Sequence, residues 1–174
     1  HHSTLQQLAK RLRDKQHSVE IEKDVRLSDI VGHIDLVIDG NIAIEIKTTR
    51  QSHARPSKHY FTQLKYYMAI LGANFGKILV ESYNAVTEPW SETNVKLNND
   101  ELKDTLSELE EKASIFRRAI AANEWLLAPH VINDPDRAWQ CKKCPYRLDC
   151  WTHEGYKVRQ TFDKGEWKEE YYKE

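Results

Sequence analysis

The segment at residues 31–49, VGHIDLVIDGNIAIEIKTT, constrains the fold more than any other part of the chain. It predicts two strands joined by a turn around Asp39-Gly40-Asn41, because apolar residues alternate with other residue types on both sides of that turn. Successive side chains of a strand point to opposite faces of a sheet. The number of residues in the turn therefore decides which side chains meet across the two strands.

A three-residue turn at residues 39–41 places Asp35 directly opposite Glu45, whereas a two-residue turn would place them on opposite faces. The longer turn also puts all six branched aliphatic residues of the two strands together on the other face: Ile34, Leu36, Ile38, Ile42, Ile44 and Ile46. Such a turn needs a left-handed residue, which Gly40 or Asn41 can supply. We therefore predict the three-residue turn, with both acids on one polar face.

The same polar face carries Lys47, with His33 opposite it. Cβ atoms of opposed residues lie about 4.5–5.5 Å apart, and two carboxylates at that separation repel each other unless a divalent cation lies between them. Oxygen ligands of this kind suit Mg²⁺ or Mn²⁺, which activate water for attack on a phosphodiester. Lys47 can hold that water or neutralise the transition state. The alternative interpretation is a surface ion network on an exposed sheet face.

The remaining pattern predicts an α/β fold. Apolar residues at helical spacing predict helices at residues 4–16, 59–71 and 99–123. Alternation or short apolar runs predict strands at residues 19–27, 75–83 and 93–97, with Lys23 the one misfit in the first of them. Residues 164–174 are expected to form a charged, loosely held tail.

Composition limits the possible partners. A length of 174 residues predicts one domain, with room for a small appendage. The 26 Lys and Arg residues nearly balance 27 Asp and Glu residues, so a nucleic acid would have to meet a local basic patch. The loop at residues 50–58 offers one, with Arg50, Arg55 and Lys58 as candidate DNA-binding residues. No apolar run is long enough to span a membrane, so we expect no membrane association.

Three motifs together resemble a known family. They are Gly32-His33-Ile34-Asp35, then Glu45-Ile46-Lys47, and then Gln63 with Tyr67 one helical turn later. This set is similar to the PD-(D/E)XK nucleases of the RecB type, in a branch where the motif has a G-x-x-D form and Ile34 replaces the proline. The resemblance implies a restriction-endonuclease-like core, with a central mixed sheet flanked by helices.

The resemblance also implies roles for individual residues. Asp35, Glu45 and the backbone carbonyl of Ile46 would bind the metal, and Lys47 would be catalytic. Gln63 and Tyr67 would support DNA binding and the geometry of the active site. His2, with Leu5 three positions on, loosely matches a metal-binding histidine of this branch, although His1-His2 can equally be the remnant of an expression tag.

Cys141, Cys144 and Cys150 form a C-x2-C-x5-C run. An odd, clustered set of thiols favours a metal site over disulfides and indicates a reducing, cytoplasmic compartment. Thiolates select zinc or an iron–sulfur cluster, and His153 is the candidate fourth ligand for zinc. The run resembles that of the Fe–S exonucleases of CRISPR adaptation, which implies a [4Fe–4S] cluster. The chain has no fourth cysteine, so we expect that ligand to come from outside it. The alternatives are a cluster with three protein ligands and a zinc site.

We therefore predict a nuclease core at residues 1–123 and a cysteine-rich segment with a charged tail at residues 124–174, packed on the core. The predicted activity is metal-dependent exonuclease cleavage of DNA, on single-stranded ends. Lys142, Lys143 and Arg147 would contact phosphates, and the resemblance implies a CRISPR integrase as partner. The alternatives are the nuclease module of a helicase–nuclease recombination complex, an inactive DNA-binding or scaffold protein of the same fold, and a zinc-binding interaction module.

Overall fold

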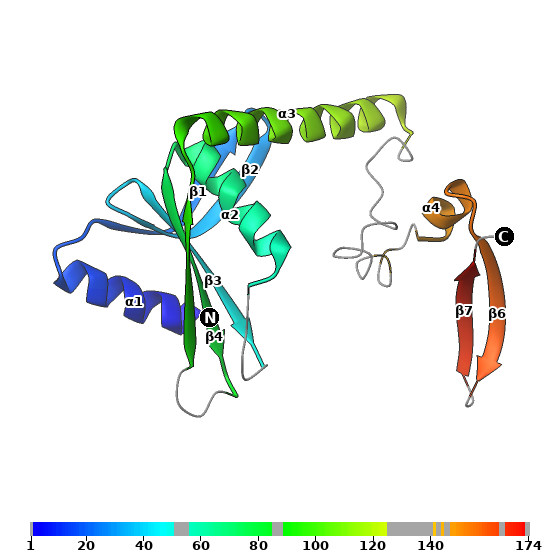
Figure 1. The fold of residues 1–174 in the computed structure, drawn as a ribbon, viewed down its shortest axis with the longest axis horizontal. Helices are drawn as coiled ribbons and strands as arrows, with labels where there is room; N and C mark the ends of the chain where they lie inside the picture. The colour runs from blue at the N-terminus through cyan, green and yellow to red at the C-terminus, as the bar shows by residue number, and fades with distance from the viewer. Residues whose placement is uncertain are drawn as a thin grey trace. The chain divides into compact units, whose positions relative to one another are not determined.

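The computed structural model describes residues 2–50, 56–84, 89–124, 141, 144, 147–163 and 166–172. The side chains of residues 2, 3, 147, 148, 158, 160–163 and 166–171 are left out of that description. The chain divides into two compact units, His1–Glu111 and Lys112–Glu174. Each unit is described by itself below (Figure 1).

The first unit is built on a mixed sheet. Over the described residues the sheet has five strands in the order β1-β2-β3-β4-β5. The strands are β1 Val19–Leu27, β2 Ile30–Ile38, β3 Ile42–Thr49, β4 Phe75–Ser82 and β5 Trp90–Lys96. Only the β3–β4 pair is parallel, because α2 crosses over between these two strands, and the other neighbours are antiparallel.

Three helices accompany this sheet, close to the predicted positions. They are α1 His2–Asp14, α2 Lys58–Leu71 and α3 Asn99–Ala122, the last of which continues past Glu111 into the second unit. α3 starts at a capping box, in which Asn98 Oδ1 accepts the Glu101 amide at 2.9 Å and Glu101 Oε2 accepts the Asn98 amide at 2.7 Å. The predicted α/β class, with a mixed sheet flanked by helices, is confirmed.

α1 and α2 cover opposite faces of the sheet (Figure 1). α1 packs its apolar stripe, including Leu5 and Ala9, against Leu36, Ile44 and Ile46. The other face packs against α2 and the start of α3 through a larger buried cluster: Val25, Ile34, Val37, Ala43, Leu64, Met68, Ala69, Ala73, Ile78, Val80, Val95, Leu97 and Leu102. Burial of these two apolar sets from water holds the layers together.

The predicted aliphatic face is correct for five of its six members. Leu36, Ile38, Ile44 and Ile46 are buried on the α1 side and Ile42 packs against them, but Ile34 belongs to the cluster under α2. The change of face coincides with an irregularity in the β1–β2 pair, where Glu22 has a left-handed φ of 51° and the strand register passes over both Glu22 and Asp35. Beyond this point Val25 and Ile34 both belong to the cluster under α2.

The second unit contains a short helix and a hairpin among its described residues. These are α4 Arg147–His153, β6 Lys157–Asp163 and β7 Glu166–Tyr172, with β6 and β7 antiparallel. The expectation of a loosely held tail is wrong for residues 166–172, because they pair with β6. None of the helices in the described portion has the length and apolarity that a membrane crossing requires.

Candidate active site

The β2–β3 turn has the predicted length. Ile38 pairs with Ile42 and Leu36 pairs with Ile44, so residues 39–41 form the turn, and this register continued by one step leads to Asp35 and Glu45. Gly40 is left-handed as predicted, with a φ of 72°, while the second left-handed residue is Asp39 rather than Asn41. The Asp39 carboxylate accepts the Ser18 amide at 2.9 Å, which fixes the turn against the start of β1.

The two strands stop pairing where the site begins. The ladder ends at Leu36 and Ile44, and the backbone amide of Ile46 donates instead to Asp35 Oδ2 at 2.7 Å. A carboxylate therefore takes the place of a backbone carbonyl at this point of β3. This bond orients Asp35 beside Glu45, so the structure brings together the two acids that the turn length predicted.

Glu45 is a buried carboxylate, with 2% of its surface exposed. Lys47 Nζ donates to its Oε1, but its Oε2 is buried without a hydrogen-bond partner among the described residues. The pKa of Glu45 is raised to about 7, chiefly by burial and also by the neighbouring Asp35 charge, while the hydrogen bond and charge of Lys47 oppose the rise. Burial likewise raises the pKa of Asp35, while the Ile46 amide and Lys47 oppose the rise.

The prediction that this face of the sheet is polar is wrong. Glu45 alternates along β3 with the α1-side residues, and its own face carries Ala43, which is buried under α2. The face is apolar over most of its area and polar only where β2 and β3 separate. The sequence pattern missed this because α2, which covers the face, is distant in sequence from the hairpin.

Lys47 is positioned by two contacts. Besides the bond to Glu45, its Nζ lies 5.1 Å from the centroid of the Tyr60 ring, within the range of a cation–π interaction. Tyr60 is in the first turns of α2 and packs at the edge of the core. It occupies the same helix face as Gln63 and Tyr67, at positions i, i+3 and i+7, and this spacing is the sequence signal that could have identified it.

Gln63 and Tyr67 interact as their spacing suggested. Gln63 Nε2 donates to the Tyr67 hydroxyl at 2.9 Å. The Tyr67 ring lies against β2 at Gly32, where a Cβ atom would come within 2.5 Å of Tyr67 Cε1. The glycine of the G-x-x-D motif is thus explained by packing, because a side chain at position 32 would push this tyrosine away from the strand that carries Asp35.

These residues lie inside a region that matches one family. The profile of the PD-(D/E)XK nuclease superfamily matches residues 2–150, which is most of the chain. The chain belongs to this superfamily. No curated protein matches it.

Solved structures resemble this PD-(D/E)XK chain only distantly. SSO0001 is 20% identical, with a TM-score of 0.49, and the match covers 84% of this chain and 66% of that one. The alkaline exonuclease LHK-Exo from Laribacter hongkongensis is 14% identical, with a TM-score of 0.42 and coverage of 69% and 72%. LHK-Exo in complex with dAMP is 15% identical, with the same TM-score and coverage. The chain therefore spans just under two thirds of the length of SSO0001.

Other predicted residues of this PD-(D/E)XK chain lie outside the acidic cluster, by which we mean Asp35 and Glu45. His33, predicted opposite Lys47, is instead hydrogen-bonded to Asp24 across the β1–β2 pair, at 2.6 Å. Arg50 and Lys58 are exposed at the end of β3 and the start of α2. Positions 55, 142 and 143 (Arg55, Lys142 and Lys143) lie outside the described residues, as do the side chains of positions 2 (His2) and 147.

A third acid, which sequence analysis did not single out, lies near Asp35. The charge of Glu22, a left-handed residue of β1, contributes to the raised pKa of Asp35, after the larger effect of burial. Its signal in the sequence was indirect. Lys23 is the one residue that breaks the alternation of β1, and the break coincides with the irregular backbone at Glu22.

The three cysteines do not form a preassembled metal site. They are free thiols, and the Cys144 amide donates to the Cys141 carbonyl at 3.2 Å. The pKa of Cys150 is raised by burial and by the neighbouring Cys144 and Cys141, so the three sulfurs lie in one neighbourhood. Throughout the described residues, no group of three or more His, Cys, Asp or Glu side chains is arranged to hold a metal ion. The predicted Fe–S cluster is thus not supported by this geometry.

Proposed function

We propose that this PD-(D/E)XK protein is a divalent-metal-dependent DNA exonuclease. The observation that carries the proposal is the buried Glu45 Oε2, which has no partner among the described residues and lies beside Asp35. A buried carboxylate oxygen without a donor is unfavourable unless a cation or proton compensates it. The donor set of two carboxylates, with the Ile46 carbonyl as the third expected ligand, has the hard oxygen chemistry that suits Mg²⁺ or Mn²⁺.

A bound divalent ion supplies Lewis-acid chemistry, because it lowers the pKa of coordinated water and stabilises charge on a phosphate. The chain's own residues do the rest. Asp35 and Glu45 hold their carboxylates at the point where β2 and β3 diverge. Lys47 Nζ places a positive charge beside them, where it neutralises charge that develops on the phosphate. Tyr60 and the Gln63–Tyr67 pair keep α2 and Lys47 in position.

The test is cleavage of end-labelled single- and double-stranded DNA with Mn²⁺, Mg²⁺ or EDTA. We expect Asp35→Ala and Glu45→Gln to abolish cleavage. Asp104→Asn, which removes an exposed carboxylate from α3, serves as the matched control and should remain active. If both acid variants still degrade DNA with Mn²⁺, the site assignment is wrong. Trimming from labelled ends, rather than internal cutting, is the result expected of an exonuclease.

We also propose a role in CRISPR spacer acquisition, with an integrase as partner and the cytoplasm as location. This part rests on the resemblance of the cysteine run and the G-x-x-D motif. The competing function within the superfamily is the nuclease module of a recombination complex. Copurification with the integrase of the same genome favours the first, whereas copurification with a helicase favours the second.

The cysteine segment is proposed to hold a [4Fe–4S] cluster with a fourth ligand from outside this chain. The C-x2-C-x5-C spacing of Cys141, Cys144 and Cys150 and its resemblance to the Fe–S exonucleases support this proposal. Metal and sulfide analysis of anaerobically purified protein tests it, with Cys144→Ser as the variant that should lose the metal. Iron with inorganic sulfide supports the cluster, one zinc per chain supports the zinc alternative, and absence of both metals contradicts a metal site.

A further inference from the structure

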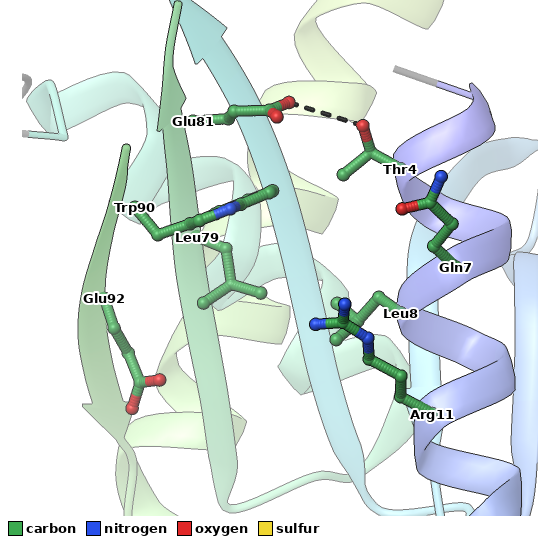
Figure 2. Close-up of a pocket in the computed structure, with 8 residues that line it drawn as sticks. All are labelled: Thr4, Gln7, Leu8, Arg11, Leu79, Glu81, Trp90 and Glu92. Atoms are coloured by element: carbon green, nitrogen blue, oxygen red, sulfur yellow. Dashed lines mark hydrogen bonds between the residues drawn. The ribbon is translucent and has the colours of Figure 1, made fainter. Parts of the chain in front are cut away.

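A groove lies on the α1 side of the sheet, opposite the face that carries Glu45. It has a volume of about 410 Å³ and runs between one face of α1 and the strands β4 and β5. Figure 2 shows its lining side chains, with Arg11 extending from α1 toward the strands. Its floor is apolar, because Leu8 and Leu79 belong to the core cluster beneath α1. No residue of the acidic cluster lines it.

Two groups in the groove are available to a ligand. Arg11 is exposed and has no hydrogen-bond or ion-pair partner in the described part of the chain. Trp90, at the start of the edge strand β5, keeps 39% of its surface exposed. A groove lined by both a free guanidinium and an open indole ring is suited to a ligand that combines an anionic group with a flat aromatic one.

The two carboxylates of the groove already have partners. Glu92 forms an ion pair with Lys77 at 2.6 Å, and Glu81 accepts a hydrogen bond from Thr4 Oγ1 at 3.4 Å, drawn in Figure 2. The charge of Glu92 is therefore compensated by a neighbouring lysine, and Glu81 is held at one end of the groove. The positive charge of Arg11 is the one that a ligand can neutralise.

The groove begins close to Lys47, at the carboxyl ends of β3 and β4. In the parallel β3–β4 pair, Lys47 is opposite Val80 and the next residue, Thr48, is opposite Glu81. Glu81 thus lies one step of strand register beyond Lys47, on the other face. Tyr83 follows two residues later with 59% of its surface exposed. The groove and Lys47 therefore lie on opposite faces of the same end of β3 and β4.

We propose that the groove binds a nucleotide unit of single-stranded DNA, with its base against Trp90 and its phosphate against Arg11. The identity of the ligand as DNA rests on the proposed function, but binding here requires neither metal nor hydrolysis. Stacking on an aromatic ring tolerates every base, so the groove holds a strand without reading its sequence. This would give an enzyme that degrades DNA a second, sequence-independent grip on its substrate.

The test measures binding of a fluorescein-labelled oligothymidylate by anisotropy, in EDTA, with Asp35→Ala as the background so that the probe stays intact. In that background, Arg11→Gln and Trp90→Leu should each weaken affinity about tenfold, from the loss of a phosphate contact or a stacked base. Lys10→Gln removes a positive charge from the same helix outside the groove. It is the matched control and should change affinity less than about twofold.

Salt dependence separates the two contacts. Each phosphate contact to a single strand contributes about 0.7 to the slope of log affinity against log salt, so Arg11→Gln should lower the slope by about this amount. Trp90→Leu should leave the slope unchanged, and Trp90→Phe, which keeps a ring, should restore most of the affinity. Competition with free thymidine monophosphate distinguishes a strand site from a mononucleotide site. The proposal requires the oligonucleotide to bind through both residues.

The outcomes separate this inference from the proposed function. If the wild-type protein cleaves DNA while Arg11→Gln and Trp90→Leu bind the oligonucleotide as Lys10→Gln does, the groove is not a DNA site and the nuclease assignment stands. If Arg11→Gln and Trp90→Leu weaken binding of free thymidine monophosphate but not binding of the oligonucleotide, the proposal is also overturned. If the wild-type protein does not cleave but binding depends on both residues, the groove stands and the nuclease assignment fails.

Discussion

Replacing Glu45 by Gln should change how the stability of the metal-free protein depends on pH. In the folded protein this carboxylate is buried, and the pKa is raised from an ordinary value of 4.5 to about 7. In the unfolded chain it is solvated and ionises normally. The variant has nearly the same shape and keeps an oxygen that can accept the Lys47 hydrogen bond, but it has no proton to lose.

Whether stability rises or falls with pH depends on which state, folded or unfolded, keeps the Glu45 proton. Below about pH 4.5 the folded and unfolded states both keep it, so Glu45 then costs no stability. As pH rises toward 7, the unfolded chain releases the proton while the folded protein retains it, and the free energy of unfolding falls. A rise in pKa from 4.5 to about 7 corresponds to a loss of about 3 kcal/mol once the pH exceeds both values.

The assay is urea unfolding followed by circular dichroism, in EDTA, at about pH 5 and about pH 8.5. We expect the wild-type free energy of unfolding to fall between these values by about 2.5 kcal/mol more than that of Glu45→Gln, because part of the loss has already occurred at about pH 5. Asp104→Asn, at an exposed position, should keep the wild-type profile. Mn²⁺ at the higher pH should restore stability to the wild-type protein but much less to the Gln variant, because a ligand that binds the folded state stabilises it.

Equal pH profiles for the wild-type protein and Glu45→Gln would refute the reasoning. They would mean that Glu45 ionises in the folded protein as easily as in water. The side chain would then be hydrated or fully compensated by Lys47, and the unpartnered Oε2 would no longer argue for a bound cation.

Three further substitutions test the packing around the site. Gly32→Ala should cost about 1–3 kcal/mol in urea unfolding, because the new Cβ displaces the Tyr67 ring, and should also lower turnover in the cleavage assay. Lys47→Ala should reduce kcat far more than Mn²⁺ affinity measured by titration calorimetry, since a cation does not ligate a cation; an equal loss in both would contradict its role. Asn98→Ala should destabilise the protein by about 1 kcal/mol through loss of the α3 cap, with cleavage at the wild-type rate; slower cleavage would mean that this cap also supports the site.

The part of the site that the sequence predicted is the part that depends on local geometry. Strand alternation and a turn of three residues are enough to place Asp35 opposite Glu45, and helical spacing is enough to pair Gln63 with Tyr67. Neither inference needs the rest of the chain. The reason for a glycine at position 32 could not be predicted in this way. Only the position of α2 over β2 reveals that a tyrosine ring occupies the space where a side chain at position 32 would lie.

The errors have equally specific causes. Ile34 packs on the unexpected face where the β1–β2 pairing is interrupted beside Glu22, whose left-handed backbone conformation no propensity assigns to a glutamate within a strand. The supposedly polar face is mostly buried because α2 folds back over it from later in the chain. The β6–β7 hairpin was missed because its many charged residues obscure the alternation that a strand pair requires.

The shortness of the β2–β3 hairpin affects which insertions and deletions the protein can tolerate. Asp35, Glu45 and Lys47 are spaced by two adjoining strands and one tight turn, so changes of length before β1 or after β3 leave their separation untouched. Changes in the flanking loops can therefore alter access to these three residues without changing their relative positions. One residue gained or lost between Ile38 and Ile42 would instead turn Glu45 toward α1 and separate it from Asp35 in a single step.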